Sequence, residues 1–102
     1  MGLVLSQEND TAGAANVFRE LVRRDRNFAE AHNNLGLVLL QGGDVRTAQA
    51  EFMEAVRLKP LYAEARYNLA LALHQEGKEE ESRREFEKAY EISPGLRNLP
   101  HR

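Results

Sequence analysis

Residues 63–96 repeat residues 29–62 after a shift of 34 positions, and this internal repeat constrains the fold more than any other feature of the sequence. The two segments are identical at 13 of their 34 positions. Residues 1–28 match residues 35–62 in the same register, with 11 identities among 28 positions. Repeats of this length are typical of solenoids, in which each unit buries its apolar face against its neighbours. We therefore divide the chain into a unit shortened at its start (1–28), two full units (29–62 and 63–96) and a tail (97–102).

Each unit predicts two amphipathic helices around a short break. In the middle unit, apolar residues recur at helical spacing in both halves: Ala31, Leu35, Val38 and Leu39, then Ala48, Phe52, Ala55, Val56 and Leu58. We expect about six helices, at residues 1–8, 11–24, 29–41, 45–58, 63–76 and 79–92. The fold class is therefore all-α, a right-handed α-solenoid of stacked helix-turn-helix hairpins with a concave face lined by the first helices.

Glycine and aspartate residues mark the breaks inside the hairpins. Gly43 and Gly77 stand where a first helix ends and the backbone adopts a left-handed conformation, which costs little only for glycine or asparagine. Asn9 holds the same place in the first unit. Asp10 and Asp44 follow and are predicted to cap the second helices.

A glycine inside a helix predicts a close helix contact. Gly36 costs its helix up to about 1 kcal/mol relative to alanine. We infer that its small size lets the second helix, with Ala48 and Phe52, approach closely. Ala70 serves the same purpose in the third unit.

The recurring positions of the three units carry a recognisable pattern. They hold Met1-Gly2, Leu5, Ala14 and Phe18 in the first unit, Leu35-Gly36, Leu39, Ala48, Phe52, Ala55 and Pro60 in the second, and Leu69-Ala70, Leu73, Ser82, Phe86, Ala89 and Pro94 in the third. Over about 96 of its 102 residues the chain resembles the tetratricopeptide repeat family. Three positions depart from the family pattern: His32 and Arg66 replace an aromatic residue, and Arg26 replaces the proline that ends a unit.

Composition argues against several classes of partner. A net charge of -2 and a pI near 5.9 give no basic field for nucleic acid. The chain has no cysteine for a disulfide or thiolate site. It has no apolar run long enough to span a membrane and no secretory signal at its start. We expect a cytoplasmic protein that uses neither nucleic acid nor membrane as a partner.

No group of residues has the spacing of a catalytic or metal site. His32 and His74 lie at non-equivalent places in their units, so we expect structural or surface roles for them. The acidic stretch at residues 76–81 lacks the alternating oxygen ligands of a calcium loop and fits the solvated start of a helix. We expect no enzyme activity, no cofactor and no bound metal.

Function in a solenoid of this kind is usually binding on its concave face. The family resemblance implies that the first helices present a groove to an extended peptide of a protein partner. The groove residues that it implies are Glu30, Asn33, Asn34, Leu37, Leu40 and Gln41 in the second unit, Glu64, Tyr67, Asn68, Leu71, His74 and Gln75 in the third, and Leu3, Ser6 and Gln7 in the first.

Asn34 and Asn68 are identical residues 34 positions apart, inside helices where asparagine has poor propensity. A side-chain amide can accept and donate at once, so it can hold the C=O and N–H of a peptide backbone. The pattern is similar to the asparagine ladder in the repeat domain of O-linked N-acetylglucosamine transferase, which implies an extended-peptide ligand. An equally good explanation is that the pair hydrogen-bonds between the adjacent first helices or is simply part of the repeat consensus.

Another binding mode of the family is a basic clamp for a C-terminal carboxylate, used to dock large cytosolic heat-shock chaperones. The resemblance places that clamp at positions held here by Glu64 and Asn68, where lysine and arginine are needed. Glu30 and Glu64 would repel a carboxylate. We therefore predict no appreciable binding of peptides with an acidic EEVD-like end.

Self-association is the alternative function. The sequence shows no polar capping helix, and Pro100 disfavours one in the tail. We expect apolar residues to be exposed at both ends, namely Leu3, Leu5 and Val17 at one and Tyr90, Ile92 and Leu96 at the other, which allows end-to-end stacking or helix exchange between copies. A third hypothesis is that the chain is the substrate-recruiting fragment of a larger enzyme.

Overall fold

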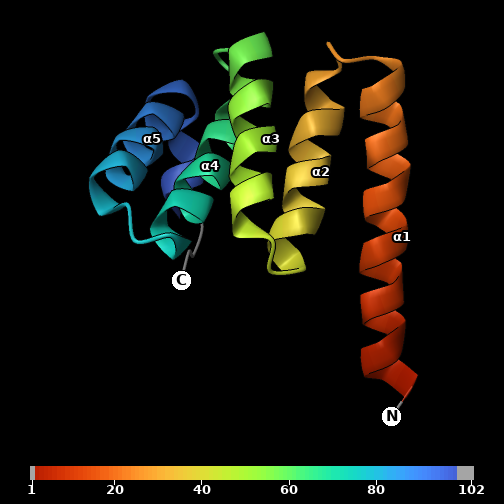
Figure 1. Ribbon diagram of the computed structural model, residues 1–102. Coiled ribbons are helices and arrows are strands. Elements are labelled where there is room, and N and C mark those ends of the chain that lie inside the picture. Colours follow the sequence, from red (N-terminus) through yellow and green to blue (C-terminus); the bar gives the residue numbers. More distant parts are fainter. Residues whose placement is uncertain (1, 99–102) are drawn as a thin grey trace.

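The described part of the chain, in a computed structural model, folds into antiparallel helices stacked so that each helix contacts the next and α2 also contacts α4 (Figure 1). The backbone is described for residues 2–98 and the side chains for residues 12–98. The helices are α1 (Gly2–Arg24), α2 (Ala29–Gln41), α3 (Val45–Leu58), α4 (Ala63–Gln75) and α5 (Glu79–Ile92), followed by the 3₁₀ helix η1 (Pro94–Asn98). None of the helices within residues 2–98 has both the length and the hydrophobicity needed to cross a membrane.

The two complete units form the predicted hairpins, α2 with α3 and α4 with α5. Three of their helices have the predicted bounds, and α4 ends one residue earlier than predicted, at Gln75. Gly43 and Gly77 have positive φ angles of 92° and 80°, as expected for residues that end a helix in the left-handed region. The Asp44 carboxylate accepts a 3.4 Å hydrogen bond from the Thr47 backbone N–H, which confirms it as the cap of α3.

Gly36 packs where the sequence predicted a close contact. Phe52 of α3 is fully buried, and a Cβ atom at Gly36 would lie 2.5 Å from its Cε1 atom. Around this contact lies the main apolar core, whose buried members are Ala15, Leu35, Leu39, Ala48, Phe52, Leu69, Ala72 and Leu73. In the third unit Ala70 is also fully buried, and its carbonyl oxygen accepts a 2.8 Å hydrogen bond from Ser82 Oγ.

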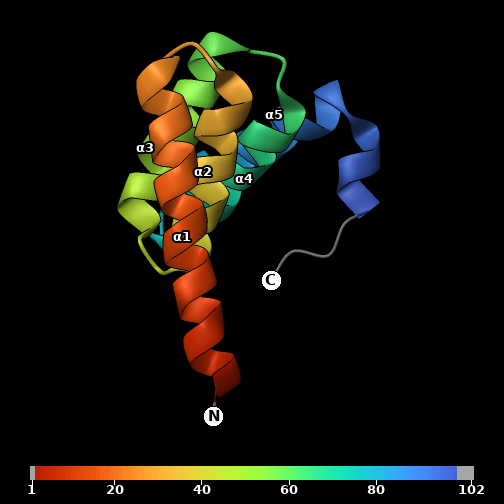
Figure 2. The same ribbon diagram turned by 90° about the vertical axis from the view of Figure 1, so that its right-hand side faces the viewer.

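The first unit does not form the predicted hairpin. We expected helices at residues 1–8 and 11–24, but α1 is one helix from Gly2 to Arg24, so Asp10 lies inside it and does not cap a second helix. The reason is local: the first unit has Asn9 where the other units have a glycine with positive φ. Extending an existing helix also adds one hydrogen bond per residue, which favours the continuous helix. The N-terminal half of α1 extends past the end of α2 (Figures 1 and 2).

The prediction of an uncovered C-terminal end is wrong for Tyr90. This residue is buried in a small apolar cluster with Tyr67 and Ala89, and Leu96 of η1 packs against the cluster. The Arg97 guanidinium lies 4.7 Å from the centre of the Tyr90 ring, in the geometry of a cation–π contact. The short helix η1 therefore covers part of this end of the solenoid.

The other residues expected at the ends have mixed outcomes. Ile92 and Leu96 are half-buried, not exposed. Val17 of α1 is 59% exposed, as predicted. The side chains of Leu3 and Leu5 fall outside the described side chains.

Candidate functional site

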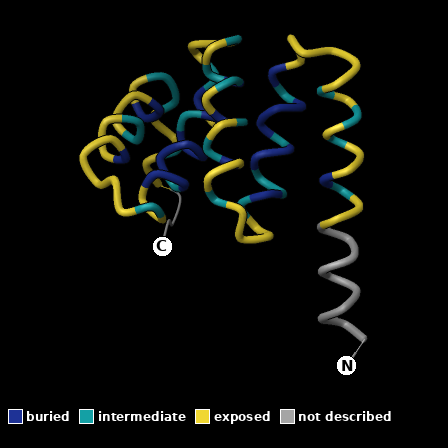
Figure 3. Tube along the Cα trace, viewed as in Figure 1, coloured by how far each residue is buried: buried dark blue, intermediate teal, exposed yellow. Residues whose placement is uncertain are grey.

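The predicted groove residues lie on α2 and α4, which contact each other across the units. Figure 3 shows that α2 is among the most buried helices. Exposure divides the predicted residues into three groups. Asn33, Tyr67 and Asn68 are buried; Glu30, Asn34, Leu37, Leu40 and Leu71 are half-buried; Gln41, Glu64, His74 and Gln75 are exposed. The side chains of Leu3, Ser6 and Gln7 are outside the described set.

A chain of side-chain hydrogen bonds joins the two units at the buried positions. Asn68 Nδ2 donates to Asn33 Oδ1 over 3.0 Å, and Asn33 Nδ2 donates to the Tyr62 hydroxyl over 3.3 Å. Asn68 is only 8% exposed and Asn33 only 5%. Burial raises the pKa of the Tyr62 phenol. The chain fixes the relative position of α2 and α4 through neutral polar groups.

Asn34 and Asn68 do not bond to each other. The partner of Asn68 is Asn33, one residue before the predicted Asn34. Asn34 is half-buried and makes no side-chain hydrogen bond to residues 12–98. Equivalent positions in successive units therefore have different environments, one amide anchored to its neighbour and the other available.

A charged pair lies at the N-terminal end of α2, beside the predicted groove residues. The Lys59 ammonium lies 2.6 Å from Glu30 Oε2, and its hydrogen bond lowers the pKa of Glu30. Lys59 is also 5.9 Å from the centre of the Tyr62 ring. Glu64, the equivalent of Glu30 in the next unit, is exposed. The face therefore carries one neutralised carboxylate and one exposed carboxylate.

The opposite end of the face is more polar and more exposed. His74 Nδ1 lies 2.9 Å from Glu79 Oε1, and both side chains are exposed. Between the two ends, Tyr67 contacts Phe86 edge-on at 5.4 Å between ring centres. Burial raises the pKa of the Tyr67 phenol. The face thus combines a buried aromatic residue with half-buried leucines and a polar margin.

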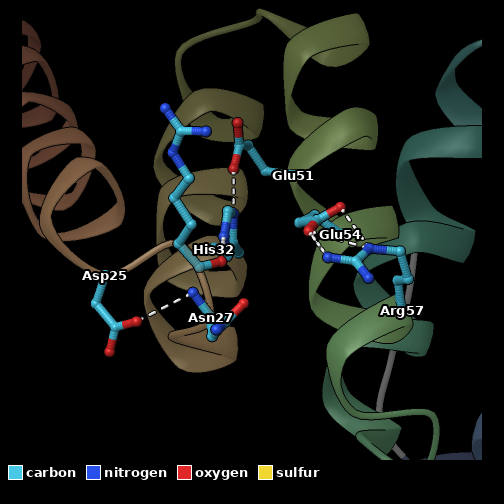
Figure 4. Close-up of polar contacts among 7 residues, drawn as sticks. Asp25, Asn27, His32, Glu51, Glu54 and Arg57 are labelled. Atoms are coloured by element: carbon cyan, nitrogen blue, oxygen red, sulfur yellow. Dashed lines mark hydrogen bonds and ion pairs between the residues drawn. The ribbon is translucent and has the colours of Figure 1, made fainter.

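His32 and Arg66, treated above as departures from the family pattern, make equivalent contacts. His32 has one ring nitrogen 2.8 Å from Glu51 Oε1 and the other 2.9 Å from the carbonyl oxygen of Arg26 (Figure 4). Arg66 donates to Glu85 Oε1 over 3.0 Å and to the carbonyl oxygen of Pro60 over 2.8 Å. In both units the partners lie six residues before and 19 residues after the donor.

These contacts tie each first helix to the preceding turn and to its own second helix. A sequence signal for them exists: a nitrogen-bearing side chain recurs after 34 residues, and so does the glutamate that it binds. The signal was not recognised because His32 and Arg66 differ from each other and both depart from the aromatic residue of the family pattern.

The described residues contain no group of three or more histidine, aspartate or glutamate side chains placed to hold a metal ion. Within the same residues every fully enclosed side-chain nitrogen or oxygen has a hydrogen-bond partner.

Comparison with protein families gives a match over most of the chain. The model of a family described as tetratricopeptide repeat matches residues 1–48 and 38–96. A comparison with curated protein sequences gives no match.

Solved structures share the fold. The crystal structure of YrrB, described as a TPR protein with an unusual peptide-binding site, has a TM-score of 0.79 and 25% identity, covering 91% of this chain and 48% of that one. A crystal structure of MamA has a TM-score of 0.78 and 22% identity, covering 88% of this chain and 53% of that one. A MamA RS-1 double mutant has a TM-score of 0.77 and 28% identity, with coverage of 92% and 53%. The chain spans about half the length of these structures.

Proposed function

Because this chain belongs to the tetratricopeptide repeat family, we propose that it is a non-catalytic interaction module that binds an extended peptide segment of a protein partner on the face formed by α2 and α4. The observation that carries the proposal is the row of asparagine amides on adjacent first helices. The described peptide-binding site of YrrB, a protein of similar fold, adds support.

The hydrogen-bond inventory of the amides favours a backbone ligand. An asparagine side chain has two N–H donors and an oxygen with two lone pairs. Asn33 uses one donor on Tyr62 and its oxygen on Asn68, while Asn68 uses one donor on Asn33. The Asn34 side chain makes no hydrogen bond within residues 12–98, so none of its donors or acceptors is used there. Asn34 and Asn68 therefore each keep a donor and an acceptor for a peptide group.

The spacing of the helices fits an extended ligand. Helices in contact lie about 8–10 Å apart, and a polyproline II segment repeats every three residues, or about 9.3 Å. Amides on α2 and α4 could then hold peptide groups one turn of such a segment apart. The half-buried Leu37 and Leu71 would contact apolar side chains of the ligand. In this respect we propose a likeness to the asparagine ladder of O-linked N-acetylglucosamine transferase.

The ligand should not be one that depends on a terminal carboxylate. Of the two predicted clamp positions, Glu64 carries an exposed negative charge and Asn68 is held by Asn33. Lys59 is close to the face but is occupied by Glu30. We propose that the ligand is an internal, extended segment with apolar residues, and that EEVD-like ends bind poorly.

A peptide array probed with the purified protein tests the proposal, followed by fluorescence anisotropy on the best segment. Asn34→Ala removes an amide without breaking a hydrogen bond to the described residues, so affinity should fall about fivefold to tenfold, the effect of roughly one hydrogen bond. Asn16→Ala, on the exposed surface of α1, is the matched control and should leave affinity unchanged. Equal affinities for the wild type and the Asn34 variant would refute the role of the amides.

Asn68→Ala separates ligand binding from the stability of the stack. This variant loses the bond to Asn33 as well as a ligand contact, so both affinity and thermal stability should fall. The recruiting-fragment hypothesis is compatible with the same site, since the compared structures are about twice as long. Self-association is the second candidate function, because Val17 and Leu21 of α1 are 59% and 36% exposed.

A further inference from the structure

An open pocket of about 620 Å³ lies beside the predicted groove, between the turn that leads into α4 and the end of α5. The pocket shares Glu64 with the groove. Its apolar wall includes Leu61 and Ile92, and its polar lining includes Lys59, Tyr62, Glu64 and Ser93. Leu61 is 77% exposed and Ile92 is half-buried. The pocket therefore offers both apolar surface and charged groups to a side chain of a ligand.

The preceding unit shows how a carboxylate at the position of Glu64 is satisfied within the chain. Glu30 stands 34 residues before Glu64, and its Oε2 atom lies 2.6 Å from Lys59 Nζ. Lys59 follows Glu30 by 29 residues, and the residue that follows Glu64 by 29 is the uncharged Ser93. Within residues 12–98 no lysine, arginine or histidine pairs with Glu64. The third unit thus repeats the carboxylate without repeating its cation.

The unneutralised charge beside this pocket is negative. Lys59 is held by Glu30, whereas Glu64 is exposed. Burial raises the pKa of the Tyr62 phenol, and the negative charges of Glu30 and Glu64 raise it further, so both carboxylates act on the pocket. Both glutamates also lie in the first turn of a helix, where the helix dipole favours them, yet Glu30 still binds a cation. Glu64 therefore keeps the capacity to bind one.

We propose that this pocket binds a lysine or arginine side chain of the peptide ligand, with the cationic group at Glu64 and the methylene stem along Leu61 and Ile92. The ligand cation takes the role at Glu64 that Lys59 has at Glu30. Long basic side chains place their stems on apolar surface and keep the charged group in water, which suits a pocket with an apolar wall and an exposed carboxylate. This inference rests on the proposed peptide-binding function and adds the class of side chain that the ligand must carry.

The place of Glu64 on α4 fits a ligand that is held at the asparagine amides. Glu64 precedes Asn68 by four residues, so the two residues share one face of α4 and lie about 6 Å apart along its axis. This distance is about the reach of a lysine side chain with its four-carbon stem. A ligand whose backbone is bound at Asn68 can therefore place a basic side chain on Glu64.

An array of capped peptides tests the inference. Each segment is printed in four versions, with lysine, arginine, glutamine or glutamate at one position, and with acetylated and amidated ends so that terminal charges play no part. The wild type should select the lysine and arginine versions. In fluorescence anisotropy the lysine version should bind about twofold to fivefold more tightly than the glutamine version, the effect of one exposed ion pair. This preference should shrink as salt is added.

Three variants assign the preference to this pocket. Glu64→Gln should abolish the preference for lysine, and Glu64→Lys should reverse it in favour of the glutamate version. Ser93→Lys supplies a lysine 29 residues after Glu64, as Lys59 stands after Glu30, and should also abolish the preference while Glu64 is still present. An unchanged preference in Glu64→Gln would overturn the inference.

A matched control separates this pocket from the overall charge of the protein. Glu87→Gln removes one negative charge from an exposed position of α5 outside the pocket and should keep the wild-type preference. Loss of the preference in this control would assign it to net charge and overturn the inference. If peptides bind but the lysine and glutamine versions bind equally, this inference is wrong while the proposed function stands. If no peptide of any version binds, both are wrong.

Discussion

Replacing Gly36 by alanine tests the central packing contact of the solenoid. Helix propensity alone predicts that Gly→Ala stabilises a helix interior by about 1 kcal/mol. At Gly36, however, the new Cβ would lie 2.5, 2.7 and 2.9 Å from three carbon atoms of the Phe52 ring. Carbon atoms in contact are normally about 3.5–4.0 Å apart. Phe52 is fully buried, so its ring has no open space into which it can move.

The magnitude follows from a matched pair of variants. Overpacking a core typically costs about 1–3 kcal/mol, which offsets or exceeds the propensity gain at Gly36. Gly13 is also a helical glycine, but nothing lies within 4 Å of the position that its Cβ would take. Gly13→Ala should therefore give the propensity gain alone. The difference between the two variants cancels propensity and should be about 1–3 kcal/mol.

Urea unfolding followed by far-UV circular dichroism measures this difference, at a protein concentration low enough to avoid association. In thermal unfolding, each kcal/mol corresponds to about 4–8 °C for a domain of about 60–100 residues. Phe52→Leu should rescue Gly36→Ala in the double variant, because the shorter side chain relieves the overlap. Equal stabilisation by Gly36→Ala and Gly13→Ala would refute the packing argument.

Three further predictions concern the polar contacts and the C-terminal end. His32→Arg should change the free energy of unfolding by less than about 1 kcal/mol, because Arg66 makes the equivalent contacts. His32→Leu should lower the free energy of unfolding by about 2 kcal/mol, because Glu51 and a carbonyl oxygen lose their partner. Urea unfolding measures both changes. Because Lys59 lowers the pKa of Glu30, this ion pair stabilises the fold above the ordinary pKa of 4.5. That stabilisation is lost as the pH falls through the lower pKa of the folded state. In thermal unfolding, Lys59→Gln should therefore lose less stability below pH 4.5 than the wild type. Ending the chain after Ser93 removes Leu96 and Arg97 from Tyr90 and should cost about 1–2 kcal/mol, with a change in tyrosine fluorescence; unchanged stability would show that η1 does not cover this end.

The helices of the two full units were predictable because their boundaries depend on local chemistry. Gly43 and Gly77 adopt the backbone conformation that ends a helix, and Asp44 caps the next one. The Gly36–Phe52 contact was also predictable, since a helical glycine needs a reason that packing supplies. Such features require only the residue and its near neighbours, so a single sequence is enough to predict them.

Other features depend on competition or on offsets between elements. The first unit carries a turn pattern at Asn9 and Asp10, yet the continuous helix α1 replaces the turn. The bond from Asn68 to Asn33 depends on how far α2 is shifted against α4, which repeat spacing does not determine. The short helix η1 follows Pro94, a residue that we took only as a helix end. In each case the outcome depends on the energy of an alternative arrangement, which residue patterns do not reveal.

The two ends of the described solenoid differ in how far their apolar side chains are covered. At the C-terminal end, Leu96 packs against the cluster that contains Tyr90, and Arg97 lies over the Tyr90 ring. At the other end, Val17 and Leu21 of α1 are 59% and 36% exposed. If the chain self-associates, the contact should therefore involve α1 and not the surface of Tyr90. Val17→Glu should then lower the average mass in a sedimentation series, and an unchanged mass would show that α1 does not mediate the contact.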